Sequence, residues 1–248
     1  MQSLYGAIAN YKLKKIMVKV DEVYQKVLAL ANKEQRGYIT PQEFNLLANQ
    51  AQMDTFEQYF YDLNQFRRTP GNNTVHADMV DILEEKISVF EQTALIILNL
   101  AGEGQLSSLG NFYRLTSIRD GNIIYESISR KEARLFQLSP LAKPTKTRPA
   151  YLVNGVNNDF ELFGRIPVAV NVDYIRTPIP VNWTYVVVQG KALYNGNATD
   201  AQNFELHPSE ETELVLKILT LAGFTLKDPN LYQAAAGEDM KSTQQEKQ

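Results

Sequence analysis

The sequence predicts an α+β protein with an N-terminal helical hairpin, a central antiparallel β-sandwich or partly open barrel, and C-terminal helices. Apolar residues recur at three- and four-residue steps up to about residue 67. From about residue 87, short β-type runs are separated by Gly, Asn, Asp and Pro, and helical spacing returns after residue 208. These changes divide the chain into an N-terminal extension (1–17), a helical region (18–86), a β domain (87–190) and a C-terminal helical section with a tail (191–248).

Two helices are predicted in the first quarter of the chain. Residues 20–33 place Val20, Val23 and Val27 on one face. The segment 40–43 (Thr-Pro-Gln-Glu) has the pattern of a capping box with proline in the first turn, so a long second helix begins there and continues to about Arg67. Residues 76–84 are expected to add a short helical turn.

Strands are predicted at eight places in the β domain. The Asp-Gly pair at 120–121 predicts a tight hairpin turn. The proline-rich segment 140–149 is predicted to be a connector, because proline cannot donate to a sheet. The predicted strands are 87–90, 94–100, 111–118, 122–127, 150–153, 159–162, 168–174 and 183–188.

The last section is predicted to contain two helices. One opens at Ser209 after Pro208 and ends near Gly223, and the other opens at Asp228 and runs into a polar tail. We expect the tail, residues 228–248, to contact a neighbouring subunit.

The composition excludes several kinds of site. The 248 residues include no Cys and two His, with 28 Asp+Glu against 25 Lys+Arg, which rules out thiolate chemistry, disulfides and three-His metal sites. The loop 32–43 resembles a calcium loop, but Arg36 stands where the metal needs an oxygen ligand. No apolar run reaches the length of a membrane span. We therefore predict no cofactor, no metal, no enzymatic activity and no membrane association.

Charge and aromatic residues indicate contacts with other proteins. The net charge of −3 is distributed in blocks of alternating sign, positive before residue 41 and over 93–190, and negative elsewhere. The basic residues between 114 and 148 fit DNA phosphates, an acidic protein collar or an ordinary sheet surface. On the long helix the core is expected to take Phe56 and Phe60, which leaves Tyr59 and Tyr61 for a neighbouring subunit.

The order of these segments is similar to a known class of protein. It is carried by the helical stretch 20–66, LGNFYRLTSI (109–118), SPLAKPTKTRPAYLV (139–153), VNVDYIRTPIPVNW (170–183) and the segment 204–235. In this order the chain resembles the neck or ring proteins of short-tailed, crAss-like bacteriophages.

The resemblance implies a virion structural protein that is assembled in the host cytoplasm. Such proteins form closed rings, usually twelve-fold, which join the portal to the tail and surround a channel through which DNA passes without specific binding. The expected partners are other copies of the chain, the portal protein and neighbouring ring or tail proteins. The candidate interface residues are Tyr59, Tyr61, Arg148, Trp183, Tyr232 and Lys241.

One alternative function belongs to a different class. A β-sandwich binding module could recognise carbohydrate or peptide on a platform formed by Trp183, Tyr185 and Tyr194. It would be a monomer with measurable affinity for a glycan or peptide.

Overall fold

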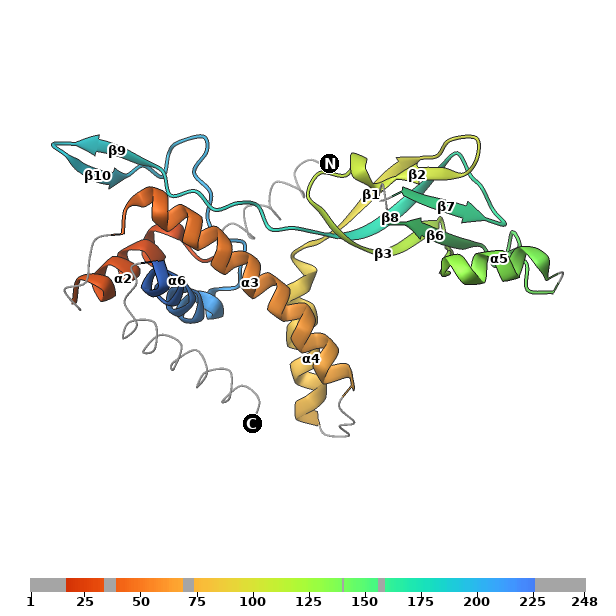
Figure 1. Cartoon of the computed structure of the whole chain (residues 1–248), viewed down its shortest axis with the longest axis horizontal. Coiled ribbons are helices and arrows are strands. Elements are labelled where there is room, and N and C mark those ends of the chain that lie inside the picture. Colours follow the sequence, from red (N-terminus) through yellow and green to blue (C-terminus); the bar gives the residue numbers. More distant parts are fainter. Residues whose placement is uncertain (1–16, 34–38, 69–73, 140, 156–158, 226–248) are drawn as a thin grey trace, which may run out of the picture. The chain divides into compact units, whose positions relative to one another are not determined.

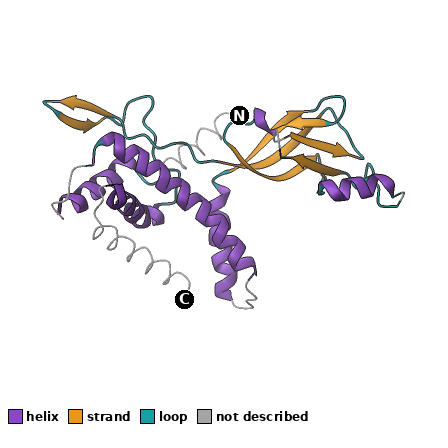
Figure 2. Ribbon diagram, in the orientation of Figure 1, coloured by secondary structure: helices purple, strands orange, loops and turns teal. Residues whose placement is uncertain are grey.

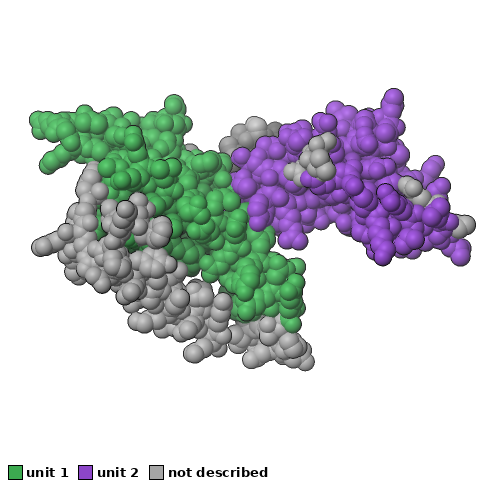
Figure 3. Space-filling model, viewed as in Figure 1, with its two compact units in different colours: residues 1–89, 178–248 green, residues 90–177 purple. Residues whose placement is uncertain are grey.

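The computed structural model describes residues 17–33, 39–68, 74–139, 141–155 and 159–225. The chain forms two compact units, one made of residues 1–89 and 178–248 and the other of residues 90–177 (Figure 3). The first unit is mainly helical with one two-stranded ribbon, and the second is mainly β-structure (Figure 2). The predicted α+β class is confirmed.

The helical unit contains α2 (Val20–Lys33), α3 (Pro41–Arg68), α4 (Thr74–Ser88) and α6 (Glu211–Thr225) (Figure 1). Helix α3 packs against α4 and α6, and α2 packs against α6. The rings of Tyr24 on α2 and Phe44 on α3 lie 4.5 Å apart. The apolar faces that define these helices in the sequence therefore meet in one core.

The predicted start of α3 is confirmed in detail. The hydroxyl of Thr40 accepts a hydrogen bond from the backbone N–H of Glu43, whose carboxylate accepts one from the backbone N–H of Thr40. This is a reciprocal capping box. The N–H of Thr40 and, next, its hydroxyl lower the pKa of Glu43.

The strand predicted at 87–90 is wrong. Helix α4 extends through Ser88, because Leu83 and Ile87 are spaced by one helical turn and are both buried. The short helical turn predicted at 76–84 is thus the middle of a 15-residue helix.

The β unit is built from two four-stranded sheets. The first has the order β1-β8-β3-β4 and the second β2-β7-β6-β5. Their bounds are β1 (Glu91–Ile97), β2 (Glu103–Gln105), β3 (Phe112–Asp120), β4 (Ile123–Ile124), β5 (Glu126–Ser127), β6 (Ala150–Asn154), β7 (Asp159–Phe163) and β8 (Ala169–Arg176). A tight hairpin joins β3 to β4 as predicted, and its two turn residues are Gly121, at a φ of +60°, and Asn122.

The two sheets share one core. Ile118 of β3 and Val172 of β8 pack with Phe160 and Leu162 of β7, and all four are almost fully buried. Of the two predicted arrangements, this is the sandwich. One pair is not antiparallel, because β5 runs parallel to β6 over two residues.

Strand β2, helix α5 and two 3₁₀ turns were not predicted. Helix α5 (Arg130–Leu138) begins with a capping box between Ser129 and Glu132, and its Ala133 and Phe136 pack in a small core with Leu152 of β6. Short 3₁₀ turns occupy Leu106–Ser108 in the β unit and Pro208–Glu210 in the helical unit.

The predicted domain boundary near residue 190 differs from the structure. The β unit ends at residue 177, and the ribbon of β9 (Tyr185–Val188) and β10 (Lys191–Tyr194) belongs to the helical unit. The helix predicted from Asp228, the polar tail and the extension 1–16 lie outside the described residues.

Candidate interaction surfaces

The first candidate surface is the β9–β10 ribbon. Its turn residues Gln189 and Gly190 have φ values of +50° and +77°, as in the type I′ turn that suits a two-residue hairpin. Val188 pairs with Lys191 next to the turn, and Tyr185 pairs with Tyr194 at the other end. The ribbon is a complete hairpin with no third strand among the described residues.

One face of the ribbon is apolar and exposed. In an antiparallel pair, directly opposite residues share a face, so Val186, Val188 and Leu193 lie together with Lys191. All three apolar side chains are exposed. Val187 on the opposite face is 66% exposed as well. A two-stranded hairpin is marginally stable alone, so this apolar surface is typical of a segment that a partner covers.

The base of the ribbon is held firmly on the helical core. Trp183 stacks with Tyr185 and with Tyr194, each at 5.7 Å between ring centroids. Its indole Nε1 donates to the carboxylate of Asp21 at 3.0 Å. Burial in this stack, and then the negative charge of Asp21, raise the pKa of Tyr194. The ribbon therefore projects from a fixed base.

The segment that leads into the ribbon is fixed by side-chain amides of α3. Asn45 bonds both the N–H and the C=O of Trp183, and Asn49 bonds both groups of Val181. Gln52 donates to the C=O of Ile179. Four helical residues rise about 6 Å and two extended residues about 6.6 Å, so the two periodicities match. This row of three amides, the amide ladder, replaces a neighbouring β-strand.

The second candidate surface is the free edge of β1. Two hydrogen bonds, from Arg176 N–H to Phe90 C=O and from Leu98 N–H to Val168 C=O, show which residues of β1 bond to β8 and which face the other way. The even-numbered residues between them form the bonded pairs. The N–H and C=O groups of the odd-numbered residues Glu91, Thr93, Leu95 and Ile97 consequently point to the other edge, where no described strand pairs.

This edge carries exposed apolar side chains. Leu95 is 67% exposed and Ile97 is 75% exposed. Natural proteins usually protect such an edge with charge, proline or a covering element, because an open edge pairs readily with another strand. A seven-residue edge with two exposed apolar residues is therefore a candidate for strand addition.

A groove of about 560 Å³ follows the same edge. Its floor and walls come from β1, the β1–β2 turn, β2, the 3₁₀ turn after it and the first residue of β7. The lining residues are Leu95, Ile96, Ile97, Leu98, Asn99, Glu103, Gln105, Ser108 and Asp159. The charged members are Glu103 and Asp159, so the groove is acidic.

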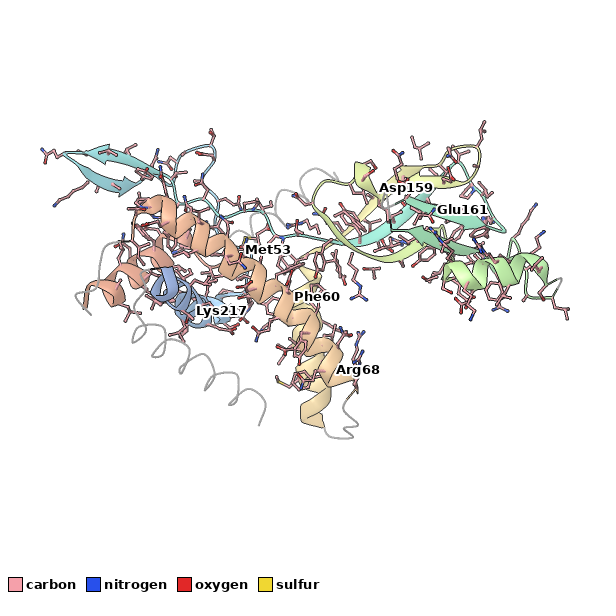
Figure 4. The ribbon with its side chains drawn as sticks, in the orientation of Figure 1. Met53, Phe60, Arg68, Asp159, Glu161 and Lys217 are labelled. Carbon is pink, nitrogen blue, oxygen red and sulfur yellow. The ribbon has the colours of Figure 1, made fainter. Side chains whose placement is uncertain are left out.

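Asp159 adds an unsatisfied group to this groove. It lies at the start of β7, two residues before Glu161 on the same strand (Figure 4). Its Oδ1 is buried and has no hydrogen-bond partner among the described residues. A buried carboxylate oxygen without a donor is costly, which makes this atom a natural acceptor for a donor from a partner.

The outer face of the first sheet carries a polar cluster centred on Asp173. Its carboxylate accepts hydrogen bonds from Thr93 at 2.6 Å, from Ser117 at 2.7 Å and from Arg119 at 3.1 Å. Burial raises the pKa of Asp173, but these bonds outweigh it and hold the pKa below its usual value. The cluster joins β1, β8 and β3, which gives it a structural role.

The two tyrosines predicted at an interface differ in solvent exposure. Tyr61 is 66% exposed, as expected. The prediction that Tyr59 lies outside the core is wrong: Tyr59 is 5% exposed and Lys86 lies 5.5 Å above its ring. Phe60, which the core was expected to take, is only partly buried.

The remaining predicted interface residues have different outcomes. Arg148 is exposed in the connector, with Glu126 at 3.6 Å. Trp183 is 2% exposed, so it is an anchor of the ribbon and cannot form an open platform. Tyr232 and Lys241 lie outside the described residues.

The same stack contains the three aromatic residues of the alternative binding platform. Trp183, Tyr185 and Tyr194 do come together, but the two tyrosines and Tyr24 cover the indole. Trp183 is 2% exposed and Tyr194 is 38% exposed, so the indole is covered while the outer tyrosine keeps part of its surface open.

A pocket of about 390 Å³ lies in the helical unit. It lies between α3, α4 and the start of α6. Lys86, the lysine that lines it, forms an ion pair with Glu210 at 2.5 Å. Lys217 near it pairs with Glu213 at 2.6 Å and donates to Thr55 and Gln58 (Figure 4). Both ion pairs are largely buried, and each lysine already has an acidic partner, as in a structural network.

Two further searches concern the described residues only. They contain no group of three or more His, Asp or Glu side chains placed to hold a metal ion. None of the described helices combines the length and apolar character that crossing a bilayer requires.

Comparison with known proteins adds no family. No protein-family model matches the sequence, and no curated protein matches it significantly. The interpretation of the surfaces above therefore depends on their own geometry.

Proposed function

We propose that this chain is a virion structural protein, a subunit of an oligomeric ring in the neck or tail of a bacteriophage that joins the portal to the tail. The observation that carries the proposal is that the described residues include two different unpaired β surfaces with exposed apolar side chains. These are the exposed apolar face of the β9–β10 ribbon and the free edge of β1.

Two different unpaired surfaces favour a closed ring over a symmetric dimer. In a ring, one face of each subunit meets a different face of the next, and rotation closes the assembly. The ribbon and the β1 edge are different in shape, since one is a projecting hairpin and the other is the side of a sandwich. This pair of surfaces is the geometry that a head-to-tail contact requires.

The resemblance in segment order to phage neck proteins supplies the place of assembly. It implies a ring, usually of twelve copies, beside the portal and other ring or tail proteins in the virion. The net charge of −3 agrees with a conduit through which DNA slides, because tight phosphate binding needs a concentrated basic face. Tyr61 and Arg148, both exposed, remain candidates for contacts with those partners.

The experiment is to measure the mass of the purified full chain over a concentration series by mass photometry and light scattering. We expect a discrete closed oligomer that appears as a ring in negative-stain images. A chain that stays monomeric throughout the series would contradict the proposal, and so would open-ended filaments, because both are incompatible with a closed ring.

A binding module would behave differently in the same preparation. It would remain a monomer and would bind a glycan or peptide array. Trp183, one of the three residues of the platform that this function predicts, is 2% exposed.

A further inference from the structure

We propose that the β9–β10 ribbon of one copy docks on the β1 edge of a second copy and closes the acidic groove beside it. This inference rests on the proposed ring function and names the contact that builds the ring. It assigns both surfaces of the contact and the residues that decide its register.

The backbones of the two surfaces complement each other. The bond from Asn195 N–H to Thr184 C=O shows that the bonded pairs of the ribbon are 184/195, 186/193 and 188/191. The N–H and C=O of Val187 therefore point away from β10, to the open edge of β9. Leu95 presents the same groups on the open edge of β1. Pairing β9 with β1 would give the open N–H and C=O groups of both strands hydrogen-bond partners and would extend the first sheet.

The side chains also complement each other. With Val187 opposite Leu95, Val187 shares a face with Leu95 and Ile97, whereas Val186, Val188 and Leu193 lie on the other face, that of Ile96, which lines the groove. The ribbon residues, Leu95 and Ile97 are all exposed in the single chain. Burial of apolar surface stabilises association by about 25 cal/mol per Å². Strand pairing therefore brings together surfaces that are both unfavourable in water.

The ribbon and the groove carry opposite charges. Lys191 is the only charged residue of the sequence between 185 and 194. The charged residues that line the groove are Glu103 and Asp159, both acidic. Asp159 Oδ1 is buried there without a donor, and a lysine ammonium is a donor that would satisfy it. The ribbon therefore supplies, through Lys191, the hydrogen-bond donor that Asp159 Oδ1 lacks.

The occupant is a second copy because both halves of the contact belong to every chain. Each subunit then supplies one ribbon and one β1 edge, so every ribbon in a closed ring finds an edge without another protein. The ribbon is also presented on a rigid base by the Trp183 stack, which lowers the cost of ordering it on docking.

The chain has no Cys, so engineered thiols test the contact without background. One preparation carries Leu95→Cys and another carries Val187→Cys. Mixed and oxidised, they are expected to give a disulfide-linked dimer on a non-reducing gel, which neither variant gives at the same yield alone. The control mixes Val187→Cys with Leu46→Cys, a similarly exposed position on α3, and is expected to give no dimer above background.

A double variant separates docking between chains from docking within one. A chain with both Leu95→Cys and Val187→Cys that closes on itself, while the mixture gives no dimer, would overturn the proposal. A dimer from the mixture supports it, because the two thiols are then on different chains.

The charge contact has its own test. Lys191→Glu is expected to weaken association about tenfold or more, and pairing it with Asp159→Lys is expected to restore part of that loss. Lys131→Glu on the exposed face of α5 is the matched control and is expected to leave association unchanged. Equal effects of Lys191→Glu and Lys131→Glu would refute the charge contact.

The outcomes keep the two proposals apart. If the wild-type chain forms a closed oligomer but the mixed thiols do not link and Lys191→Glu assembles normally, the ribbon contact is wrong and the ring function stands. If the wild-type chain is a monomer and no link forms, both are wrong.

Discussion

The side-chain amide of Asn49 forms two hydrogen bonds with a single residue, Val181: Oδ1 accepts from its N–H at 2.7 Å and Nδ2 donates to its C=O at 3.0 Å. These are the two bonds that a neighbouring β-strand would otherwise make. Asn45 repeats the arrangement one helical turn earlier with Trp183. An extended segment is thereby held against a helix with its backbone satisfied, which is why the ribbon that follows has a fixed base.

Asn49→Leu tests the amide ladder. The change keeps a similar volume but leaves both backbone groups of Val181 without partners, so we expect the free energy of unfolding of the helical unit to fall by about 2–4 kcal/mol. Trp183 is the only tryptophan, and its fluorescence during urea unfolding reports on this unit. Gln50→Leu, one position along on the exposed side of α3, is expected to change it by less than about 0.5 kcal/mol. Equal losses for the two variants would contradict the ladder.

Gly104→Ala tests the close packing within the second sheet, where Gly104 of β2 pairs with Phe160 of β7. A Cβ at Gly104 would lie 2.3 Å from Cζ of Phe160, and that ring is fully buried. The ring must tilt into a filled core, so we expect the β unit to lose about 1–3 kcal/mol. Hydrogen exchange of peptides from β6 and β7 measures the loss.

Gly110→Ala is the matched control for this position. A Cβ there meets nothing within 4 Å, so the exchange of the same peptides should not change beyond a few tenths of a kcal/mol. Destabilisation by both variants alike would show that the contact with Phe160 is not the cause.

Asp173 predicts how the stability of the β unit depends on pH. Although burial raises the pKa of Asp173, the bonds from Thr93, Ser117 and Arg119 leave it below the unfolded value of 3.8. A folded pKa below the unfolded one stabilises the fold above pH 3.8, and this contribution disappears as the pH falls through the folded pKa.

The measurement is urea unfolding of wild type and Asp173→Asn between pH 7 and pH 2.5, followed by hydrogen exchange of peptides from β3 and β8. At pH 7 we expect the variant to be less stable by about 1–3 kcal/mol, because the bonds to a carboxylate are replaced by weaker ones. The difference should shrink below pH 3.8. A gap that stays constant down to pH 2.5 would show that ionisation of Asp173 is not responsible.

Ser129→Ala tests the cap of α5. The hydroxyl of Ser129 accepts from the N–H of Glu132 at 3.3 Å, and the Glu132 carboxylate accepts from the N–H of Ser129 at 2.8 Å. Loss of the hydroxyl should destabilise the helix by about 1 kcal/mol, seen as faster amide exchange in its first turn. Ser127→Ala, an exposed change in the preceding strand, should leave that exchange as it is; faster exchange in both would point to a general loosening.

Much of the fold is written in local patterns. The capping box at Thr40 and Glu43, the spacing of Val20, Val23 and Val27, and the tight turn at Gly121 depend on neighbouring residues, and all were predicted where they occur. Helix α5 has the same kind of signal at Ser129 and Glu132, and that signal would have found it. The amide ladder has a weaker one: Asn45, Asn49 and Gln52 recur at four- and three-residue steps beside the buried stripe of α3.

The candidate surfaces depended on the tertiary structure. The sequence by itself determined the α+β class, most elements and the lack of thiol chemistry, because helix spacing, caps, turns and composition act over a few residues. Only the folded chain decided that Trp183 and Tyr59 are buried, that the hairpin belongs to the helical unit, and that β1 lies at an open edge beside Asp159. Those facts are set by contacts between residues far apart along the chain, such as the 132 positions between Asn49 and Val181.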